Sequence, residues 1–370
     1  MMQKLFSRLY PIQVAYLFAV AFTNAMLLLW FQKEGASYSG IILFYIIIYA
    51  TAVASIAAFR SIRPRLFFIL GIICNMAIFA IYAFGFKKEY LPFIALLYGP
   101  LFVLFWINYN ILFFGNIDPD KKAFSSAVYA FAFSLLSTVT PIMAGFTASK
   151  AGMQAVFIIG IAFMAIALLL SARIGEKRSY YNLRISLKCI KGVKTIIFIE
   201  GFWEHITFVA IPLLSLFFIQ NELGLGAYLS YLGLTGAVAS LVIARISDRI
   251  KKRRAFIRIL AVSLAIATML LIFGSNIYLW IIFTGIIYLI APALKPFQTT
   301  VSLDNVKCGM RELMIGREFM LNLGRLCGIC LFLMSMAFGM KYGSIFLAAI
   351  AMMAYPVVMK MKGHYEARSN

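Results

Sequence analysis

Long apolar runs separated by short polar segments are the dominant pattern of this chain. A helix that crosses a bilayer needs about 20 predominantly apolar residues, and about twelve runs reach that length. The pattern predicts an all-α polytopic membrane protein with twelve transmembrane helices. The predicted spans lie near 11–32, 39–59, 66–85, 91–115, 124–147, 153–172, 195–219, 227–246, 256–274, 276–294, 316–339 and 342–359.

The amino-acid composition supports lipid as the solvent of the folded chain. Hydrophobic residues make up 63% and charged residues only 13% of the 370 residues. A soluble domain could not hide so much apolar surface from water. The first apolar run is long enough to span, so no cleavable signal peptide is expected. We therefore expect a multi-pass protein of the cell (plasma) membrane.

Basic residues are distributed unevenly among the segments that connect the predicted spans. The chain has 34 lysines and arginines and a formal net charge of +21. With a cytosolic N-terminus, nearly all of them fall on the cytosolic side, as the positive-inside rule requires. Both termini are therefore predicted to be cytosolic, and no nucleic-acid partner is expected. The predicted outside loops contain only Lys33, Lys87, Lys88, Lys150 and Lys341.

The longest polar connection near the middle of the chain divides the spans six and six. It covers 174–194 and contains a cluster of basic residues. The predicted organisation is an N-terminal six-helix bundle over 1–173, a cytosolic inter-bundle loop over 174–194 and a C-terminal six-helix bundle over 195–370.

The five cysteines fall in apolar runs or in loops that are predicted to be cytosolic. Disulfides are therefore not expected. Cys327 and Cys330 have the spacing of a metal-binding pair, but no nearby histidine or cysteine completes a site. Neither a metal nor a cofactor is expected.

The end of the eighth run carries a short motif. Residues 244–253 read A-R-I-S-D-R-I-K-K-R. The segment resembles the cytosolic loop signature of the major facilitator superfamily, G-x-L-[AS]-D-R-x-G-[RK]-[RK], with alanine and lysine at the two glycine positions. An aspartate between basic residues at a helix end can bind neighbouring helix termini and arginines. Asp248, Arg249, Lys252 and Arg253 are therefore candidate residues of a cytosolic gate.

The resemblance implies two parallel bundles around a central cavity, which work as a monomer by rocking-type alternating access. In this family the first, fourth, seventh and tenth spans line the cavity. Their aromatic and amide side chains suit an amphipathic or aromatic solute, because no cluster of arginine or lysine is predicted at mid-membrane depth. The candidate cavity residues are Asn24, Trp106, Asn108, Tyr109, Trp203, Thr207, Trp280 and Asn322.

Ionisable side chains inside spans are costly and mark candidate functional positions. Glu200 and Glu204 lie one turn apart on the seventh span. Arg325 lies two turns after Glu318 on the eleventh span, at a depth comparable to that of Glu204. One hypothesis makes Glu204 a carboxylate that couples transport to protons. The alternative is a permanent ion pair between Glu204 and Arg325 that holds the C-terminal bundle together.

Three further candidates accompany this pair. Glu200 is expected to contact the basic segment 174–194. Glu318 is an ion-pair candidate. His205 is the only histidine predicted within a span, and either hydrogen-bonded packing or proton relay would explain it.

Taken together, these patterns predict a secondary active transporter for a small solute, with proton-coupled export of an amphipathic or drug-like compound favoured. Uptake of a small nutrient and a non-transporting membrane sensor or scaffold remain alternatives. An enzyme is not expected, since the sequence shows neither a Ser, His and Asp set nor paired acidic metal ligands at a helix end.

Overall fold

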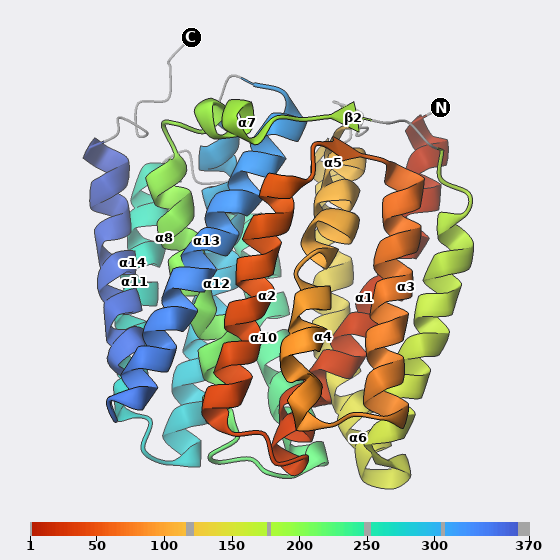
Figure 1. The fold of residues 1–370 in the computed structure, drawn as a ribbon. Coiled ribbons are helices and arrows are strands. Elements are labelled where there is room, and N and C mark those ends of the chain that lie inside the picture. Colours follow the sequence, from red (N-terminus) through yellow and green to blue (C-terminus); the bar gives the residue numbers. More distant parts are fainter. Residues whose placement is uncertain (1, 116–121, 176–178, 248–252, 305–307, 362–370) are drawn as a thin grey trace.

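Long helices that run roughly along one common direction make up most of the computed structural model, which describes residues 2–115, 122–175, 179–247, 253–304 and 308–361 (Figure 1). The helices of the first half are α1 (Met2–Lys33), α2 (Tyr38–Ala58), α3 (Pro64–Phe84), α4 (Leu91–Tyr98), α5 (Asn108–Gly115) and α6 (Lys122–Ser171). Those of the second half are α7 (Leu183–Cys189), α8 (Lys194–His205), α9 (Ile211–Ser215), α10 (Glu222–Ser247), α11 (Arg253–Leu270), α12 (Ile277–Asp304), α13 (Met310–Ala337) and α14 (Gly343–Met361).

Two of the spans contain a π-helical segment in their middle. Phe102–Ile107 connects α4 to α5, and Ile206–Ala210 connects α8 to α9. Pro100 precedes the first segment and Pro212 follows the second. Proline removes a backbone donor, so a regular α-helical hydrogen-bond ladder is interrupted near each of these positions. Short 3₁₀ turns at Lys88–Tyr90 and Leu271–Phe273 lie at span ends.

Eleven helices in the described part of the chain are long and apolar enough to cross a membrane. The difference from the predicted twelve lies in α6, which covers both the fifth and the sixth predicted runs. Gly152 divides α6 with a φ of 83°, a conformation that glycine adopts without strain. Figure 1 shows the chain reversing its direction within α6. Two crossings within α6 are consistent with the sequence, and the count of twelve stays a prediction.

The connection between the two halves contains a short strand and a short helix where the sequence predicted a loop. Its strand β2 (Ser179–Tyr180) pairs antiparallel with β1 (Ser61–Ile62) of the first half, so that Ser61 lies opposite Tyr180. The hydroxyl of Tyr181 donates to the carbonyl of Ile56, 3.0 Å away, and burial raises the pKa of Tyr181. The inter-bundle segment is therefore fastened to the end of α2.

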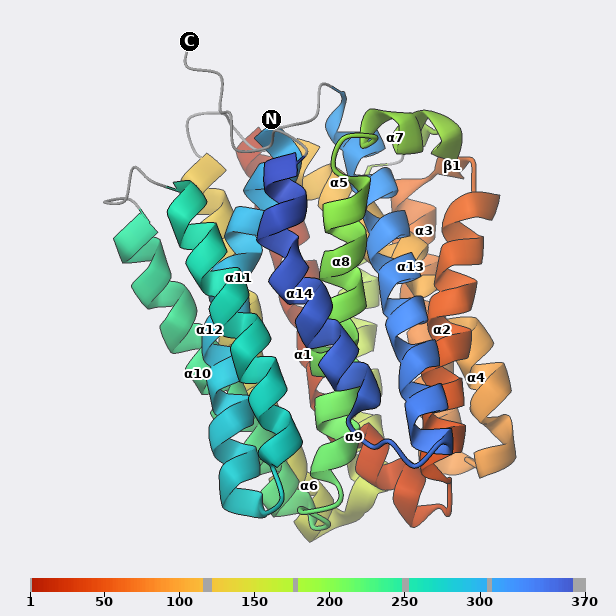
Figure 2. The same cartoon turned by 90° about the vertical axis from the view of Figure 1, so that its left-hand side faces the viewer.

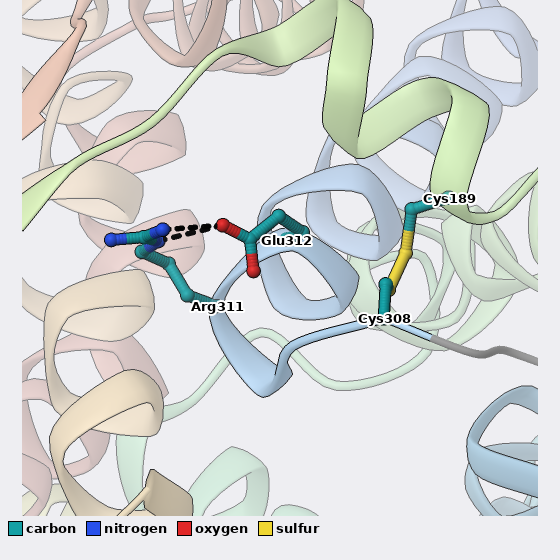
Figure 3. Close-up of a disulfide and its surroundings, with 4 residues drawn as sticks. All are labelled: Cys189, Cys308, Arg311 and Glu312. Carbon is teal, nitrogen blue, oxygen red and sulfur yellow. Dashed lines mark hydrogen bonds and ion pairs between the residues drawn. A yellow bond between two sulfur atoms is a disulfide. The ribbon is translucent and has the colours of Figure 1, made fainter.

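A disulfide joins the end of α7 to the segment before α13 (Figure 3). It links Cys189 and Cys308, whose Cα atoms lie 6.0 Å apart, and Arg311 contacts Glu312 beside it. The expectation of no disulfide is therefore corrected. The two cysteines are 119 residues apart in sequence, and only the packing of α7 over the end of α13 brings them together.

The two halves meet closely along α6 and α10, where small residues let the backbones approach. A Cβ atom on Gly233 would lie 2.2 Å from the carbonyl oxygen of Ser137, and the Cα of Gly145 is 3.1 Å from where a Cβ of Gly226 would lie. Figure 2 shows the second-half helices from another side, with α14 beside both α11 and α8.

Side chains also join the halves at both ends of the bundle. At the end where α1 finishes, Lys33 pairs with Glu222, and the ring of Tyr38 stacks on that of Phe217 with centroids 4.5 Å apart. At the opposite end, Ile56 of α2 belongs to the same buried apolar cluster as Ile315 of α13.

Candidate functional site

A cavity of about 760 Å³ lies between the first-half and second-half helices. Residues of α1, α2, α6, α8, α10 and α12 line it, together with both π-helical segments. Such segments occur often at functional sites, because the extra residue in the turn changes which side chains face a ligand. Phe102 and Trp106 face the cavity from the first segment, and Thr207 and Phe208 face it from the second.

The first-half wall of the cavity is aromatic and carries neutral polar groups. The rings of Tyr16 and Phe105 stack with centroids 3.3 Å apart, and Trp106 meets Tyr16 edge-on at 5.6 Å. The amide of Asn75 donates to the hydroxyl of Tyr16 over 2.8 Å. Asn24 is exposed to the cavity. This wall can pack against an apolar or aromatic body and offers a few hydrogen-bonding groups.

Charged side chains are concentrated on the second-half wall. Glu200 and Glu204 of α8 both line the cavity, and both are buried. The Nη2 atom of Arg317 on α13 lies 2.6 Å from the Glu200 carboxylate, and Lys295 Nζ on α12 lies at the same distance from it. A buried carboxylate needs such partners, because its desolvation is otherwise very costly.

The second carboxylate has a matching set of partners. Arg325 donates from Nε over 2.8 Å to one oxygen of Glu204, its Nη2 forms a salt bridge of 2.6 Å with the same oxygen, and Lys295 contacts the other oxygen. The Nη1 atom of Arg325 donates to the Asn322 side chain at 3.0 Å, and its guanidinium lies 5.1 Å from the centre of the Phe208 ring. Lys295 therefore bridges two carboxylates, each of which is also held by an arginine of α13.

Several predicted site residues do come together at this cavity. Asn24, Trp106, Trp203 and Thr207 line it with the two glutamates. The indole of Trp203 donates to the hydroxyl of Thr268 at 3.0 Å, which fixes the ring at the cavity wall. The predicted proximity of Glu204 and Arg325 is also found in the structure.

Four predicted cavity residues do not line it, and these predictions are corrected. Asn108 donates to the carbonyl of Pro64 at 2.9 Å, and Tyr109 donates to Gln13 at 2.8 Å. They follow Trp106 by two and three residues, so the helical turn directs them elsewhere. The two others are Trp280, which donates to Ser215 at 3.0 Å, and Asn322, which supports Arg325 from behind.

The contacts of the three further candidates, Glu200, His205 and Glu318, differ from those of Glu204. Among the described residues, Glu200 forms its ion pairs with Arg317 and Lys295 and none with the segment 174–194, because α13 packs directly against α8. His205 is fully buried against α13 beside Gly328 and outside the cavity lining, and its Nδ1 lies 2.5 Å from the carbonyl oxygen of its neighbour Phe202. The half-buried Glu318 makes no ion pair among the described residues.

The predicted cytosolic gate lies at the edge of what the structure describes. Asp248, Arg249 and Lys252 are outside the described residues, and Arg253 begins α11. The gate stays a prediction. Within the described ranges, no group of three or more metal-binding side chains comes together.

Sequence reasoning missed Lys295 and Arg317, because Lys295 lies just outside the predicted span 276–294 and Arg317 lies at the cytosolic end of the predicted span 316–339. The structure continues α12 to Asp304 and starts α13 at Met310, so both residues are inside helices. The spacing of Arg317 and Arg325, two helical turns apart on one face, would have indicated partners for two carboxylates one turn apart.

Comparison with known proteins gives a likeness at the level of structure. No family model matches the sequence, and no curated protein matches it. A POT family transporter in complex with 5-aminolevulinic acid has a TM-score of 0.76 and 10% identity, covering 96% of this chain and 95% of that chain. The human organic anion transporter MFSD10 (TETRAN) has a TM-score of 0.70 and 14% identity, covering 97% of this chain and 99% of that one. A peptide transporter POT in complex with sulfate gives 0.73 and 10%, covering 98% and 95%.

These likenesses show that the chain has the fold of these membrane transporters. The predicted resemblance to the major facilitator superfamily is thereby confirmed for the fold. All three structures are of transporters.

Proposed function

We propose that this protein is a secondary active transporter that moves a small solute across the plasma membrane by alternating access. The observation that carries the proposal is the cavity of about 760 Å³ between the two halves of the chain, with a buried ion cluster in one wall. In this proposal the chain crosses the membrane twelve times as a monomer with both termini in the cytosol. Residues 1–173 and 195–370 form the two bundles that 174–194 connects.

Alternating access requires that the halves separate at one end of the cavity while they stay together at the other. Two different sets of contacts are available for this. Lys33 with Glu222 and Tyr38 with Phe217 join the halves at one end, and the cluster around Ile56 joins them at the other. The polar side chains in the first set make it a contact that water can replace.

Glu204 is the carboxylate that we propose to couple solute movement to protons. It lines the cavity, where water and a solute can reach it, and Lys295 and Arg325 balance its charge. Protonation would remove one of the two negative charges that hold Lys295, so that only Glu200 would still compete with another anion for it. The proposed direction is export of an amphipathic compound, and uptake of a small nutrient is the alternative.

The test is transport by the purified protein in liposomes with an imposed pH gradient. A panel of amphipathic and small polar solutes is added while an internal pH dye reports proton movement. We expect solute-dependent dissipation of the gradient, which Glu204→Gln abolishes without unfolding the protein. Glu89→Gln, in an exposed 3₁₀ turn far from the cavity lining, is the matched control. Full activity of Glu204→Gln would refute the coupling role, and no response to any solute would favour a scaffold.

A further inference from the structure

The charges of the five side chains that contact one another at the cavity do not cancel. Each glutamate has its own arginine, since Arg317 pairs with Glu200 and Arg325 pairs with Glu204, both at 2.6 Å. Both arginine side chains are only 9% exposed and belong to α13, which contributes none of the residues that line the cavity. In these two pairs the glutamates line the cavity and the arginines behind them neutralise their charge.

Lys295 is the additional charge. It contacts both carboxylates, which the arginines already neutralise, and its side chain is 40% exposed. It is also the one cation among the described residues that line the cavity. The cluster of five side chains therefore contains three cations and two carboxylates, and the surplus positive charge is at the surface that a solute meets. The next carboxylate, Glu318, is half-buried on α13 and interacts electrostatically with Arg317 and Arg325, but it does not line the cavity and makes no ion pair with Lys295.

The opposite wall has the complementary chemistry. Tyr16, Tyr49, Phe102 and Trp106 of the first half face the cavity, and the polar side chains among them are neutral amides and hydroxyls. Apolar rings take up a hydrophobic body, whereas one excess cation in a partly desolvated wall attracts one negative charge. A solute with two negative charges would leave one of them without a partner in an apolar cavity.

We propose that the cavity binds an amphipathic monoanion, whose negative head group pairs with Lys295 and whose apolar body packs against the aromatic wall of the first half. This inference rests on the proposed function in taking the cavity as the solute site. It narrows the solute from amphipathic compounds in general to those with a single negative charge.

The test measures binding directly and needs no transport. Two matched sets of probes share one body within each set: 4-phenylbutyrate, 4-phenylbutyramide and 4-phenylbutylamine, and 1-naphthylacetate with its amide and its amine analogue. Each is titrated against the purified full-length protein in lipid nanodiscs by calorimetry and by the shift in Tm. We expect at least one carboxylate to bind about tenfold more tightly than its amide, because one charge contact is worth roughly that factor.

Variants assign the preference to Lys295. Lys295→Gln should remove the difference between carboxylate and amide, and Lys295→Arg should keep it. Glu200→Gln should strengthen carboxylate binding several-fold, because it removes a competing anion. Lys87→Gln, an exposed lysine outside the cavity, should change nothing. The Glu200 and arginine variants keep the test decisive if Lys295→Gln fails to fold.

Other outcomes overturn the inference. Tightest binding of the amines would show a cation site, and equal binding of carboxylate and amide would show that the charge of Lys295 is not used. Lack of binding by both carboxylates would also refute it. Carboxylate binding without transport of any solute would overturn the proposed function alone, and transport of other solutes without carboxylate preference would overturn this inference alone.

Discussion

Arg325 holds Glu204 through two nitrogens, with Nε at 2.8 Å and Nη2 at 2.6 Å from the same carboxylate oxygen. The two residues come from α13 and α8, which start at the same end of the bundle and pack side by side (Figure 2). Arg325 also donates to Asn322, one turn earlier on its own helix. The contact therefore holds α13 against α8 and places the positive charge of Arg325 next to the carboxylate that lines the cavity.

Loss of Arg325 should destabilise the protein. Arg325→Gln leaves Glu204 buried with Lys295 as its remaining charged partner among the described residues, and we expect the free energy of unfolding to fall by about 3 kcal/mol. Unfolding in mixed micelles measures this value. The double variant Glu204→Gln/Arg325→Gln should be more stable than Arg325→Gln alone, because no buried charge is left without its partner. Simple addition of the two single effects would contradict the pairing.

Gly201 is the position on α8 where a side chain should be least tolerated. A Cβ atom there would lie 2.2 Å from the carbonyl oxygen of Leu321, and its nearest neighbours are all backbone atoms of α13. Backbone cannot move aside as a flexible side chain can, so Gly201→Ala should cost about 1–3 kcal/mol. The Tm in detergent measures the loss. Gly85→Ala, with no heavy atom within 4 Å of its added Cβ, should leave the Tm near that of the parent.

The contact between Lys33 and Glu222 should control opening at its end of the bundle. Such an exposed pair contributes only about 0.5 kcal/mol, so Glu222→Gln should change the population of open molecules about twofold. Glu222→Lys adds repulsion and should open this end further. Hydrogen exchange of peptides around Lys33 and Phe217 should increase accordingly.

The charge-swapped double variant is the control for that contact. Lys33→Glu/Glu222→Lys should return the exchange to the parental level, because the attraction is restored. Lys341 is a second cation near this contact, and its ammonium lies 4.3 Å from the centre of the Phe217 ring. Burial lowers the pKa of Lys341, so raising the pH removes its charge earlier than that of an ordinary lysine. Equal exchange in the parent, both single variants and the double variant would show that the pair has no influence on opening.

The cysteines offer a chemical test of the packing of α7 on α13. With Cys189 and Cys308 joined, alkylation of the unfolded, unreduced protein should modify Cys74, Cys327 and Cys330 only. Prior reduction should expose all five cysteines. Mass spectrometry of intact protein counts the added groups. Cys308→Ser should leave Cys189 reactive without reduction, and modification of all five without reduction would show that the pair is not joined.

Sequence patterns predicted the membrane-spanning elements because these depend on local properties. A stretch such as 39–59 is apolar enough to enter lipid whatever lies beside it, and it matches α2 (Tyr38–Ala58) to within one residue at each end. The matched depths of Glu204 and Arg325 also followed from counting residues along two spans. Both are one-dimensional features of the chain.

The orientation of side chains was less accessible. The π-helical segment Phe102–Ile107 lies at mid-span and directs Trp106 into the cavity, whereas Asn108 and Tyr109, in the α-helical turn after it, do not line the cavity. A count along an ideal helix cannot place such residues, because one extra residue per turn rotates everything that follows.

By itself, the sequence determined that this chain enters a membrane as a series of helices, and that Glu200 and Glu204 share one helix face. Only the tertiary structure decided which cations meet them. Lys295 and Arg317 lie next to the polar connection between two predicted spans, yet α12 and α13 extend far enough to hold both residues inside helices of the bundle. Their pairing, and the surplus charge at the cavity, arise from helices more than 90 residues apart in sequence, and no local pattern records that proximity.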